Sequence, residues 1–494
     1  MTEKVLIFNN LTRSKLPFVP VKAGEVKFYS CGPTVYDFIH VGNARALIVG
    51  DLIHRIFKSL GYQVTFVRNF TDVDDKIINK AKEKNEDALV YAKRFIDECN
   101  IDMNELGMLP ATHTPLVSET IPEIIKLIED IIRNGFGYVV DGEVFFHVPA
   151  FRAYGKLSKK KLEQLEHGNR VEVDDKKKHP SDFVLWKPAK EGEIFWQSPW
   201  GKGRPGWHIE CSAMSKKYLG ETFDIHHGGV DLMFPHHENE IAQSEAGNGK
   251  AYCNYWCHHE FLNFGDTKMS KSLGNVVTIR QFTDKFGGVV LRQLLLSAHY
   301  RTVMVWSEQA IERAISDVER IHKFIIYYNA AKSKNVDSMG SDELALKIDD
   351  LVNKMKKDLS NDFNVPGAIA HFFSMIRMVN RDYLDEQLDF ITKKKLTFDL
   401  IKAVDVMIML TKDAVGMIYD NPLEVLKTVE RAKKNISKQD NKLSNEIIEK
   451  LIVERKEARA SKNWGRADEI RKELDASGIV LKDSPDGTIT WSYK

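Results

Sequence analysis

The chain has 494 residues, 43% of them hydrophobic, and its 71 basic and 70 acidic side chains leave a net charge of +1. This length predicts about three packed domains, and the composition excludes a disordered chain. Five cysteines are too few for a disulfide framework, and no apolar run reaches the ~20 residues of a membrane span. We therefore expect a cytoplasmic protein, in which clustered Cys and His more often indicate a metal or catalysis.

The first part of the chain alternates strand and helix signals. Glu25–Ser30 has the pattern of a strand that ends at Cys31-Gly32-Pro33, Asn43–Leu60 carries apolar residues at helical spacing, and Val64–Val67 is the next strand. A strand–helix–strand unit predicts a parallel sheet, whose ligands collect at the carboxyl ends of the strands. We predict that residues 1–111 form the first half of a Rossmann-like catalytic domain.

An insertion is expected to divide this domain. Residues 112–200 contain two Lys runs and short strand-like pieces such as Glu143–Phe146, and we interpret them as an inserted connective region. The second half of the catalytic domain, residues 201–286, resumes its sheet at Phe223–His226 and turns at Gly228-Gly229. A helix is predicted to begin near Pro235.

The rest of the chain is predicted to be mostly helical. Residues 287–432 have the apolar spacing of a helical bundle, and 433–444, rich in Lys, Asn and Ser, have the composition of a linker. The sequence pattern of residues 445–494 predicts a charged helical hairpin followed by a strand–turn–strand segment. The predicted fold class is therefore α/β: a Rossmann-like domain split by an insertion, then a helical bundle and a small C-terminal α+β domain.

The segment His40-Val41-Gly42-Asn43 is the first candidate for nucleotide binding. A glycine that opens a helix lets backbone donors approach a phosphate closely, and His40 and Asn43 supply side-chain donors. Gly229, in the turn of the second half, is also expected to contact ATP. The alternative is a loop histidine before an ordinary helix, because a four-residue match is weak alone.

The segment Lys268-Met269-Ser270-Lys271-Ser272 is the second candidate. Gly265 and Gly274 flank it, so the loop has hinges on both sides, and the ammonium groups of Lys268 and Lys271 would offset charge on leaving pyrophosphate. A solvated basic turn is the alternative. The occurrence of both motifs, in this order and on one alternating sheet, favours ATP-driven adenylate formation.

A metal site is predicted independently of these two motifs. His236 and Glu240 are four residues apart on a predicted helix, so both project from one face. Cys31 ends the first strand, and Cys211 lies in a different part of the chain. Zinc accepts sulfur, nitrogen and oxygen donors, so these four residues are a sound ligand set, although spacing alone cannot pair such distant ligands.

A second cluster competes with this set. Cys253, Cys257, His258 and His259 lie close together, with a Cys-to-Cys spacing that zinc also accepts. The residues between the two cysteines have the pattern of a buried strand, which favours core thiols there. Cys99, on an amphipathic helix, is also expected to be a packing residue.

Several longer segments resemble the cysteinyl-tRNA synthetases, a family of class I aminoacyl-tRNA synthetases. They are Cys31–Asp37 (CGPTVYD), Asn69–Lys76 (NFTDVDDK), Gly203–Ser212 (GRPGWHIECS) and Asp231–Glu240 (DLMFPHHENE). The resemblance runs from the first strand to the final tryptophan. One departure is visible, because Asn43 stands where the class pattern has a second histidine. An amide still donates to phosphate, so we expect activity without an acid or base role for Asn43.

The resemblance implies specific roles for the site residues. Cys31, Cys211, His236 and Glu240 would hold one zinc ion per chain. The loops of His40 and Lys268 would bind ATP with its Mg²⁺, and Lys271 would contact ATP directly. Thr71, Trp207 and Asp231 would help to line the amino-acid pocket.

The implied activity is ligation of L-cysteine to tRNA(Cys) through cysteinyl-adenylate. Serine differs from cysteine by one atom, and zinc can bind the substrate as a thiolate that a serine hydroxyl cannot imitate. We therefore expect the zinc to serve substrate recognition and not water activation. A monomer without membrane association is expected.

Recognition of tRNA is expected in the C-terminal region. There, Trp464 could stack an unpaired base and Arg466 could bind phosphate, unless Trp464 packs inward on an ordinary hairpin. Two other functions stay open. A ligase that joins cysteine to an amino sugar would lack the terminal module, and a non-catalytic binding paralogue would have lost His40, Lys268 and Lys271.

Overall fold

The structure is a computed structural model that describes residues 4–160, 175–264, 267–268, 277–334, 336–337, 343–384, 395–440, 445–461, 463–476, 479–483 and 489–493. The chain forms two compact units, residues 1–426 and residues 427–494.

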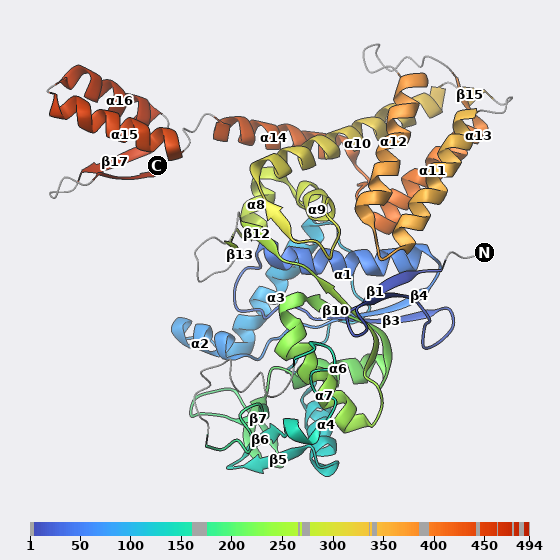
Figure 1. The fold of residues 1–494 in the computed structure, drawn as a ribbon, viewed down its shortest axis with the longest axis vertical. Helices are drawn as coiled ribbons and strands as arrows, with labels where there is room; N and C mark the ends of the chain where they lie inside the picture. Colours follow the sequence, from blue (N-terminus) through green and yellow to red (C-terminus); the bar gives the residue numbers. More distant parts are fainter. Residues whose placement is uncertain are drawn as a thin grey trace. The chain divides into compact units, whose positions relative to one another are not determined.

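A four-stranded parallel sheet lies at the centre of the first unit. Its order is β11 (Cys253–His259), β10 (Phe223–Gly229), β3 (Glu25–Ser30) and β4 (Gln63–Arg68). Helix α1 (Val41–Ser59) lies on one side of the sheet, and α6 (Ile209–Leu219) and α7 (Glu238–Asn248) lie on the other (Figure 1). All seven residues of β10 are buried, as expected of a strand covered on both faces. The predicted Rossmann-like class is confirmed.

The remaining elements of the first half surround this sheet. A hairpin of β1 (Leu6–Asn9) and β2 (Ser14–Pro17) reaches β11, where the backbone N–H of Asn10 donates to the carbonyl of Trp256 at 2.9 Å. Helices α2 (Asp75–Lys84) and α3 (Ala88–Glu105) follow β4.

The described residues of the insertion form an antiparallel five-stranded sheet and one long helix. The helix is α4 (Ile121–Arg133), and the strands are β5 (Gly137–Val140), β6 (Glu143–Phe146), β7 (Phe183–Pro188), β9 (Gly201–Pro205) and β8 (Trp196–Ser198), in that spatial order, with a 3₁₀ turn at Val148–Ala150. Buried α4 side chains such as Ile124 and Leu127 share one hydrophobic core with Met214 of α6 and Ile241 of α7. Because β9 pairs with β7 and β8, this sheet continues past the predicted boundary at residue 200.

Two short turns, Val230–Leu232 and Met233–His237, lead from β10 into α7, which begins close to the predicted position. A small sheet of β13 (Thr267–Lys268), β12 (Leu262–Phe264) and β14 (Met304–Trp306) follows, with α8 (Ile279–Phe286) and α9 (Gly288–Leu296) between β13 and β14.

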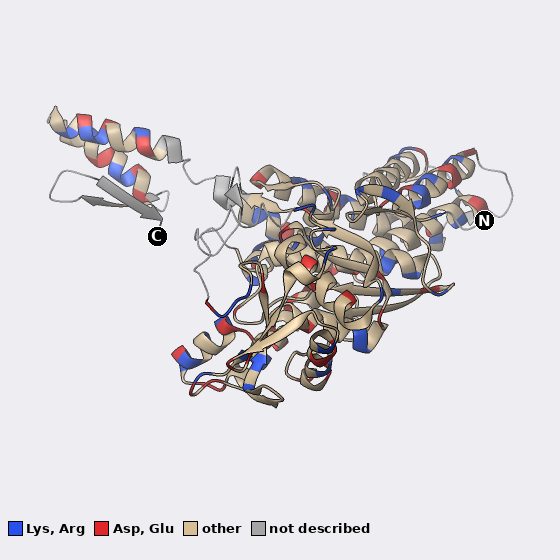
Figure 2. Ribbon diagram, turned by 60° about the horizontal axis from the view of Figure 1, so that its bottom comes forward, with Lys and Arg blue, Asp and Glu red and all other residues tan. Residues whose placement is uncertain are grey.

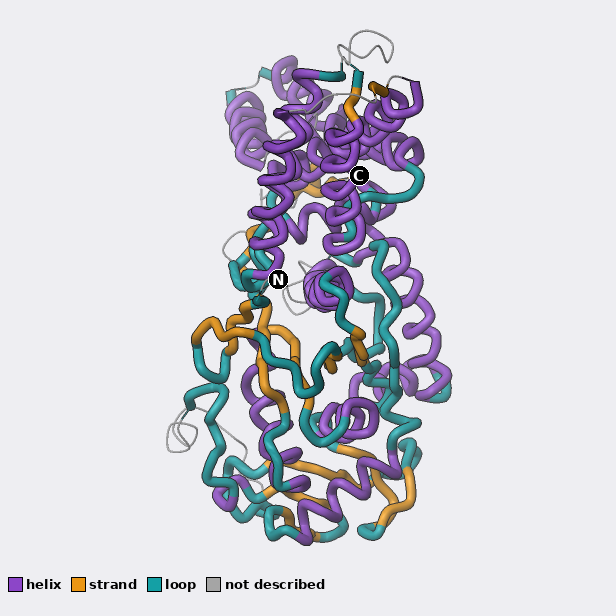
Figure 3. The backbone as a smooth tube through the Cα atoms, turned by 90° about the vertical axis from the view of Figure 1, so that its right-hand side faces the viewer, coloured by secondary structure: helices purple, strands orange, loops and turns teal. Residues whose placement is uncertain are grey.

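The predicted helical bundle is present in the first unit. It consists of α10 (Glu308–Lys334), α11 (Glu343–Ser360), α12 (Val365–Asp382) and α13 (Phe398–Leu410), with a π turn at Thr411–Val415 and the short parallel pair β15 (Val336–Asp337) and β16 (Leu396–Thr397). In Figure 3 these helices, purple and at the top, lie apart from the orange strands of the insertion at the bottom.

The second unit contains a helical hairpin and a two-stranded antiparallel sheet. They are α15 (Asn445–Ala460), α16 (Trp464–Ala476), β17 (Ile479–Asp483) and β18 (Ile489–Tyr493). Ile448, Leu451, Ile470, Leu474 and Ile479 form its buried core. Basic and acidic residues are interspersed along both helices (Figure 2).

Helix α14 (Pro422–Asp440) spans the junction of the two units and continues through residues 433–440 of the predicted linker. The buried residues Val425, Val429, Ala432 and Ile436 recur at helical spacing, which explains why a segment of linker composition is helical. Residues 441–444 of the predicted linker lie outside the described residues. Within the described ranges, no helix is long and apolar enough to cross a membrane.

Candidate active site

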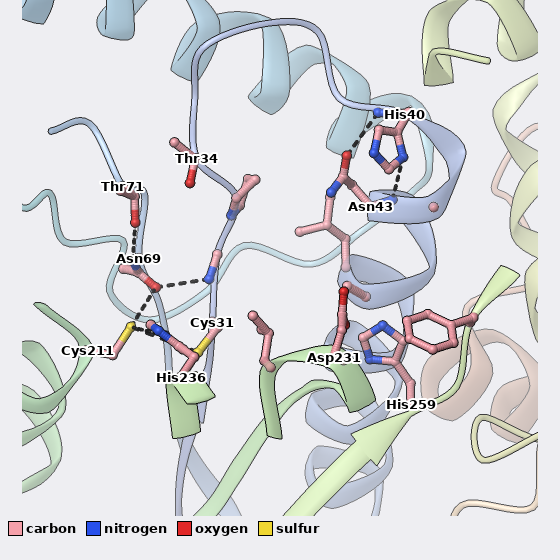
Figure 4. Close-up of a pocket in the computed structure, with 18 of the residues that line it drawn as sticks. Cys31, Thr34, His40, Asn43, Asn69, Thr71, Cys211, Asp231, His236 and His259 are labelled. Atoms are coloured by element: carbon pink, nitrogen blue, oxygen red, sulfur yellow. Dashed lines mark hydrogen bonds between the residues drawn. The ribbon is translucent and has the colours of Figure 1, made fainter. Parts of the chain in front are cut away.

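A cavity of about 490 Å³ opens at the carboxyl ends of β3 and β10. This edge of a parallel sheet is where ligands are expected. Figure 4 shows residues of both halves of the catalytic domain facing this space. The predicted site residues that line it are Cys31, His40, Gly42, Asn43, Thr71, Trp207, Cys211, Gly229, Asp231 and His236.

The four predicted metal ligands converge at one end of the cavity. The ligand atoms of Cys31, Cys211, His236 and Glu240 all lie within 4.8 Å of one another. The sulfur atoms of Cys31 and Cys211 are 3.9 Å apart, and Nε2 of His236 lies 3.0 Å from Oε1 of Glu240. Their elements explain the convergence, because Cys31 follows β3, Cys211 lies in α6, His236 lies in the turn that leads into α7, and Glu240 lies in the first turn of α7.

Neighbouring groups favour the charged forms of Cys211 and His236, although burial opposes both. A hydrogen bond from the Cys31 thiol lowers the pKa of Cys211 to about 6, against the effect of burial. Burial would lower the pKa of His236, but the Glu240 carboxylate and Cys211 raise it to about 10. Burial raises the pKa of Cys31 well above its usual value. The cluster therefore contains a thiolate at neutral pH, the form of cysteine that binds a metal ion.

A second layer of polar residues holds the ligands, and sequence reasoning missed it. Oε2 of Glu240 accepts a hydrogen bond from the Tyr252 hydroxyl at 2.9 Å and lies 2.8 Å from Nε2 of His226. Nδ1 of His236 lies 2.9 Å from Nδ1 of His208. His226 and Tyr252 come from β10 and from the residue before β11, so nothing in their local sequence indicates this role. Such partners orient metal ligands and tune their basicity.

A second, overlapping set of donors lies beside the first. Cys31, His226, His237 and Glu240 also bring their ligand atoms within 4.8 Å of one another. Nε2 of His237 is 3.4 Å from the sulfur of Cys31. Among the residues that the structure describes, these two overlapping sets are the only such groupings. The competing set of Cys253, Cys257, His258 and His259 does not converge in this way, and both of its thiols are buried in β11.

The start of α1 forms the other end of the cavity. His40 is the N-cap residue, and its Nδ1 accepts from the backbone N–H of Asn43 at 3.2 Å, while Oδ1 of Asn43 accepts from the backbone N–H of His40 at 3.1 Å (Figure 4). This reciprocal pair is a capping box. The proton of a neutral His40 ring is then on Nε2, and the Asn43 amide keeps its NH₂ donors. No acidic residue lies in the first turn of α1, so its N-terminus suits an anion.

The predicted amino-acid pocket lies beside the cysteine and histidine cluster. The Trp207 ring, 43% exposed, stacks on His236 at 4.4 Å between ring centres. The Thr71 hydroxyl donates to Oε2 of buried Glu210 at 2.9 Å. Gly32 is required here, because a side chain would place its Cβ 1.6 Å from the carbonyl oxygen of Asn69. Asp231 lines the cavity near Gly229.

Other predicted residues are described less fully. Lys268 lies in β13, where its backbone pairs with that of Asn263 in β12. The side chain of Lys268 and the whole of Lys271 lie outside the described residues. In the second unit, Trp464 is 58% exposed and so does not pack inward. Arg466 forms ion pairs with Glu454 at 2.9 Å and Glu469 at 3.2 Å.

Comparison with known proteins identifies the class of enzyme to which the chain belongs. The family model described as "tRNA synthetases class I (C) catalytic domain" matches residues 17–316. A Mycobacterium tuberculosis methionyl-tRNA synthetase in complex with methionyl-adenylate has the same fold, with a TM-score of 0.60 at 14% identity, over 81% of this chain and 93% of that one. The structure of an Agrobacterium radiobacter LeuRS–tRNA–LeuAMS complex has a TM-score of 0.58 at 11% identity, over 83% of this chain and 86% of that one. Together with the cavity at the sheet edge, these matches define the chain as a ligase of the class I aminoacyl-tRNA synthetases.

The family within that class follows from closer matches. Models described as "Cysteinyl-tRNA ligase anticodon binding domain" and "DALR domain" match residues 443–491 and 354–406. Cysteine–tRNA ligases from Geotalea uraniireducens and Halalkalibacterium halodurans are 46% and 45% identical, each over 99% of both chains. The chain belongs to the cysteine–tRNA ligase family.

Proposed function

We propose that the protein activates L-cysteine with Mg²⁺-bound ATP and transfers it to the 3′-terminal adenosine of tRNA(Cys). One observation carries this proposal: a single cavity joins a cysteine, histidine and glutamate cluster to the start of α1 with its His40 and Asn43 donors. The first end suits a thiol substrate and the second suits a triphosphate.

The proposal includes a zinc ion held by Cys31, Cys211, His236 and Glu240. Two sulfur donors, one imidazole and one carboxylate fit zinc. Neighbouring ligand atoms of the set lie 3.0 to 3.9 Å apart. When bound, the ion would supply a soft Lewis acid that takes the substrate sulfur as a thiolate. A serine hydroxyl stays protonated at neutral pH and is a poorer ligand for such a centre, which supports discrimination.

The protein groups would then act by position and charge. The cysteine carboxylate attacks the α-phosphate, where Nε2–H of His40 and the Asn43 amide donate to the phosphate oxygens, and Gly229 allows close approach. Thr71, Trp207 and Asp231 would hold the amino acid. Lys268 and Lys271 would offset the charge on pyrophosphate, and Trp464 and Arg466 would contact tRNA. A covalent enzyme intermediate is not required.

Two assays test the proposal on the purified protein. Cysteine-dependent exchange of pyrophosphate into ATP and charging of tRNA(Cys) should both occur, with serine a poor substitute. Exchange without tRNA charging would instead favour the ligase that joins cysteine to an amino sugar. Absence of exchange would favour a binding protein.

The zinc part has its own variant. Cys211→Ser should lose zinc and with it most of the preference for cysteine over serine. Cys99→Ser, which changes a buried thiol of α3 outside the cluster, is the matched control. It should keep both the zinc and the preference for cysteine over serine. If Cys211→Ser lost its zinc yet selected cysteine as before, recognition through zinc would be wrong. The cytoplasmic location and the monomeric state stay predictions.

A further inference from the structure

The cavity has few permanent positive charges. Among the described residues that line it, Lys76 is the one lysine or arginine, whereas Asp231 and Glu260 are acidic. Both substrates of the proposed adenylation step are anionic where they react, because a carboxylate must approach a phosphate. A positively charged side chain in this cavity would therefore face an anionic ligand, either a carboxylate or a phosphate.

Lys76 lies at the start of α2, beside the segment that connects Cys31 to His40. Its ammonium nitrogen is 5.2 Å from the centre of the Tyr36 ring, within the range of a cation–π contact. The carbonyl of Tyr36 accepts a hydrogen bond from the Tyr91 hydroxyl at 3.1 Å, which helps to fix this segment. Figure 4 shows the segment running from Cys31 past Thr34 to His40. Lys76 therefore lines the cavity beside the segment that joins Cys31 of the cluster to His40 at the start of α1.

The acidic residues of α2 and its cap have other partners. Asp74 caps the helix by accepting from the backbone N–H of Lys76 at 2.8 Å. Asp75 forms ion pairs with Lys187, at 3.1 Å, and with Arg204. Glu83 pairs with Lys80 at 2.9 Å. Within the described part of the chain, no carboxylate lies within ion-pair distance of the Lys76 ammonium, so its charge is available to a ligand.

We propose that Lys76 is a further catalytic residue of adenylate formation, an inference that rests on the proposed function. A cysteine carboxylate oxygen forms a bond to the α-phosphorus of ATP. The bond from that phosphorus to the oxygen bridging to the β-phosphorus breaks, and pyrophosphate leaves with the electron pair. The Lys76 ammonium contacts the cysteine carboxylate beside the α-phosphate and offsets the repulsion between the two anions as they join.

The test compares Lys76→Met, Lys76→Arg and Lys80→Met in cysteine-dependent pyrophosphate exchange. Lys80 is one turn further along α2 and does not line the cavity, so Lys80→Met is the matched control. We expect Lys76→Met to lower kcat by about 10²-fold, the scale of removing one transition-state donor. Lys76→Arg should recover part of the rate, and Lys80→Met should resemble the original protein. Zinc content and the unfolding midpoint should be equal in all.

A substrate fragment separates catalysis from pocket shape. 2-Aminoethanethiol has the thiol and amine of cysteine but no carboxylate, so its inhibition constant should be the same with Lys76→Met as with Lys80→Met. An equal weakening of this inhibitor and of exchange would overturn the inference, as would exchange by Lys76→Met within about twofold of the control. A defect confined to transfer from preformed adenylate to tRNA would also overturn it. Absence of exchange in both the original protein and Lys80→Met would overturn the proposed function itself.

Discussion

Glu240 is a fully buried carboxylate whose two oxygens face different groups. Oε1 lies 3.0 Å from Nε2 of His236 and 3.7 Å from the sulfur of Cys31. Oε2 is engaged by the Tyr252 hydroxyl at 2.9 Å and by His226 at 2.8 Å. One oxygen is thus oriented toward the candidate zinc position because the protein holds the other.

Tyr252→Phe tests this arrangement, since it removes little volume but takes away the hydroxyl that donates to Glu240 and also lies 2.9 Å from the hydroxyl of Ser215. We expect zinc affinity to fall by about 10-fold, the lower range for loss of a partner behind a metal ligand. Competition with a chromophoric chelator measures the affinity. Tyr255→Phe removes a hydroxyl that donates to the carbonyl of Pro17 at 2.8 Å, away from the cluster, and is the control. Equal affinities of the two variants would show that Tyr252 does not support Glu240.

The sequence predicts the four candidate metal ligands better than it predicts the residues behind them. Cys31, Cys211, His236 and Glu240 stand in motifs with metal-ligand chemistry, and they converge in the structure. Tyr252, like His226, has no such signal, because its role depends on which residue of another element lies opposite. Side-chain partners of this kind are fixed by tertiary packing.

The first turn of helix α1 forms a capping box and also lines the cavity. Oδ1 of Asn43 closes the capping box with the backbone N–H of His40, while its NH₂ group stays on the cavity side. Under the proposed function, Asn43 could then replace the histidine of the class pattern, since one amide can supply both an acceptor for the helix and donors for a phosphate.

Two variants at Asn43 separate these functions. Asn43→Asp keeps a capping oxygen but places a negative charge where phosphate is expected, so exchange should fall by about 10²-fold with an unchanged unfolding midpoint. Asn43→Ala should lower both the exchange rate and the unfolding midpoint, with a loss of about 1 kcal/mol of stability from the missing hydrogen bond of the capping box. Thermal unfolding and pyrophosphate exchange measure the two effects. Full exchange activity of Asn43→Asp would contradict phosphate binding at this position.

Elements with strong periodicity were predictable, and their ends were less so. The predicted strands Glu25–Ser30 and Glu143–Phe146 match β3 and β6 in full. The insertion extends past residue 200 because β9 completes its sheet, and such pairing partners cannot be read from local sequence. Helix α14 continues into the predicted linker because Ala432 and Ile436 extend its buried face, which a Lys-rich composition hides.

The whole molecule contains several buried histidines that resist protonation. Burial lowers the pKa of His54 to about 4, and burial together with Arg45 lowers that of His259 to about 3. An unfolded histidine has a pKa of about 6.5. Between about pH 6.5 and 4 the unfolded chain therefore binds more protons, so the free energy of unfolding decreases as the pH falls through this window.

Denaturant unfolding at pH 7.5, 6 and 5 measures this effect. The protein should lose stability at each step, and His54→Gln should lose less between pH 7.5 and 5 because one such group is gone. A stability curve for His54→Gln that runs parallel to that of the original protein would exclude His54 as a contributor.

At the scale of the molecule, the account depends on one centre that binds the thiol of the substrate within an adenylating cavity. Zinc K-edge X-ray absorption of the zinc-loaded protein, alone and with L-cysteine or L-serine, examines that centre directly. We predict two sulfur and two nitrogen or oxygen neighbours in the protein alone, and one additional sulfur at about 2.3 Å with cysteine but not with serine. A sulfur count that cysteine leaves unchanged would contradict the account.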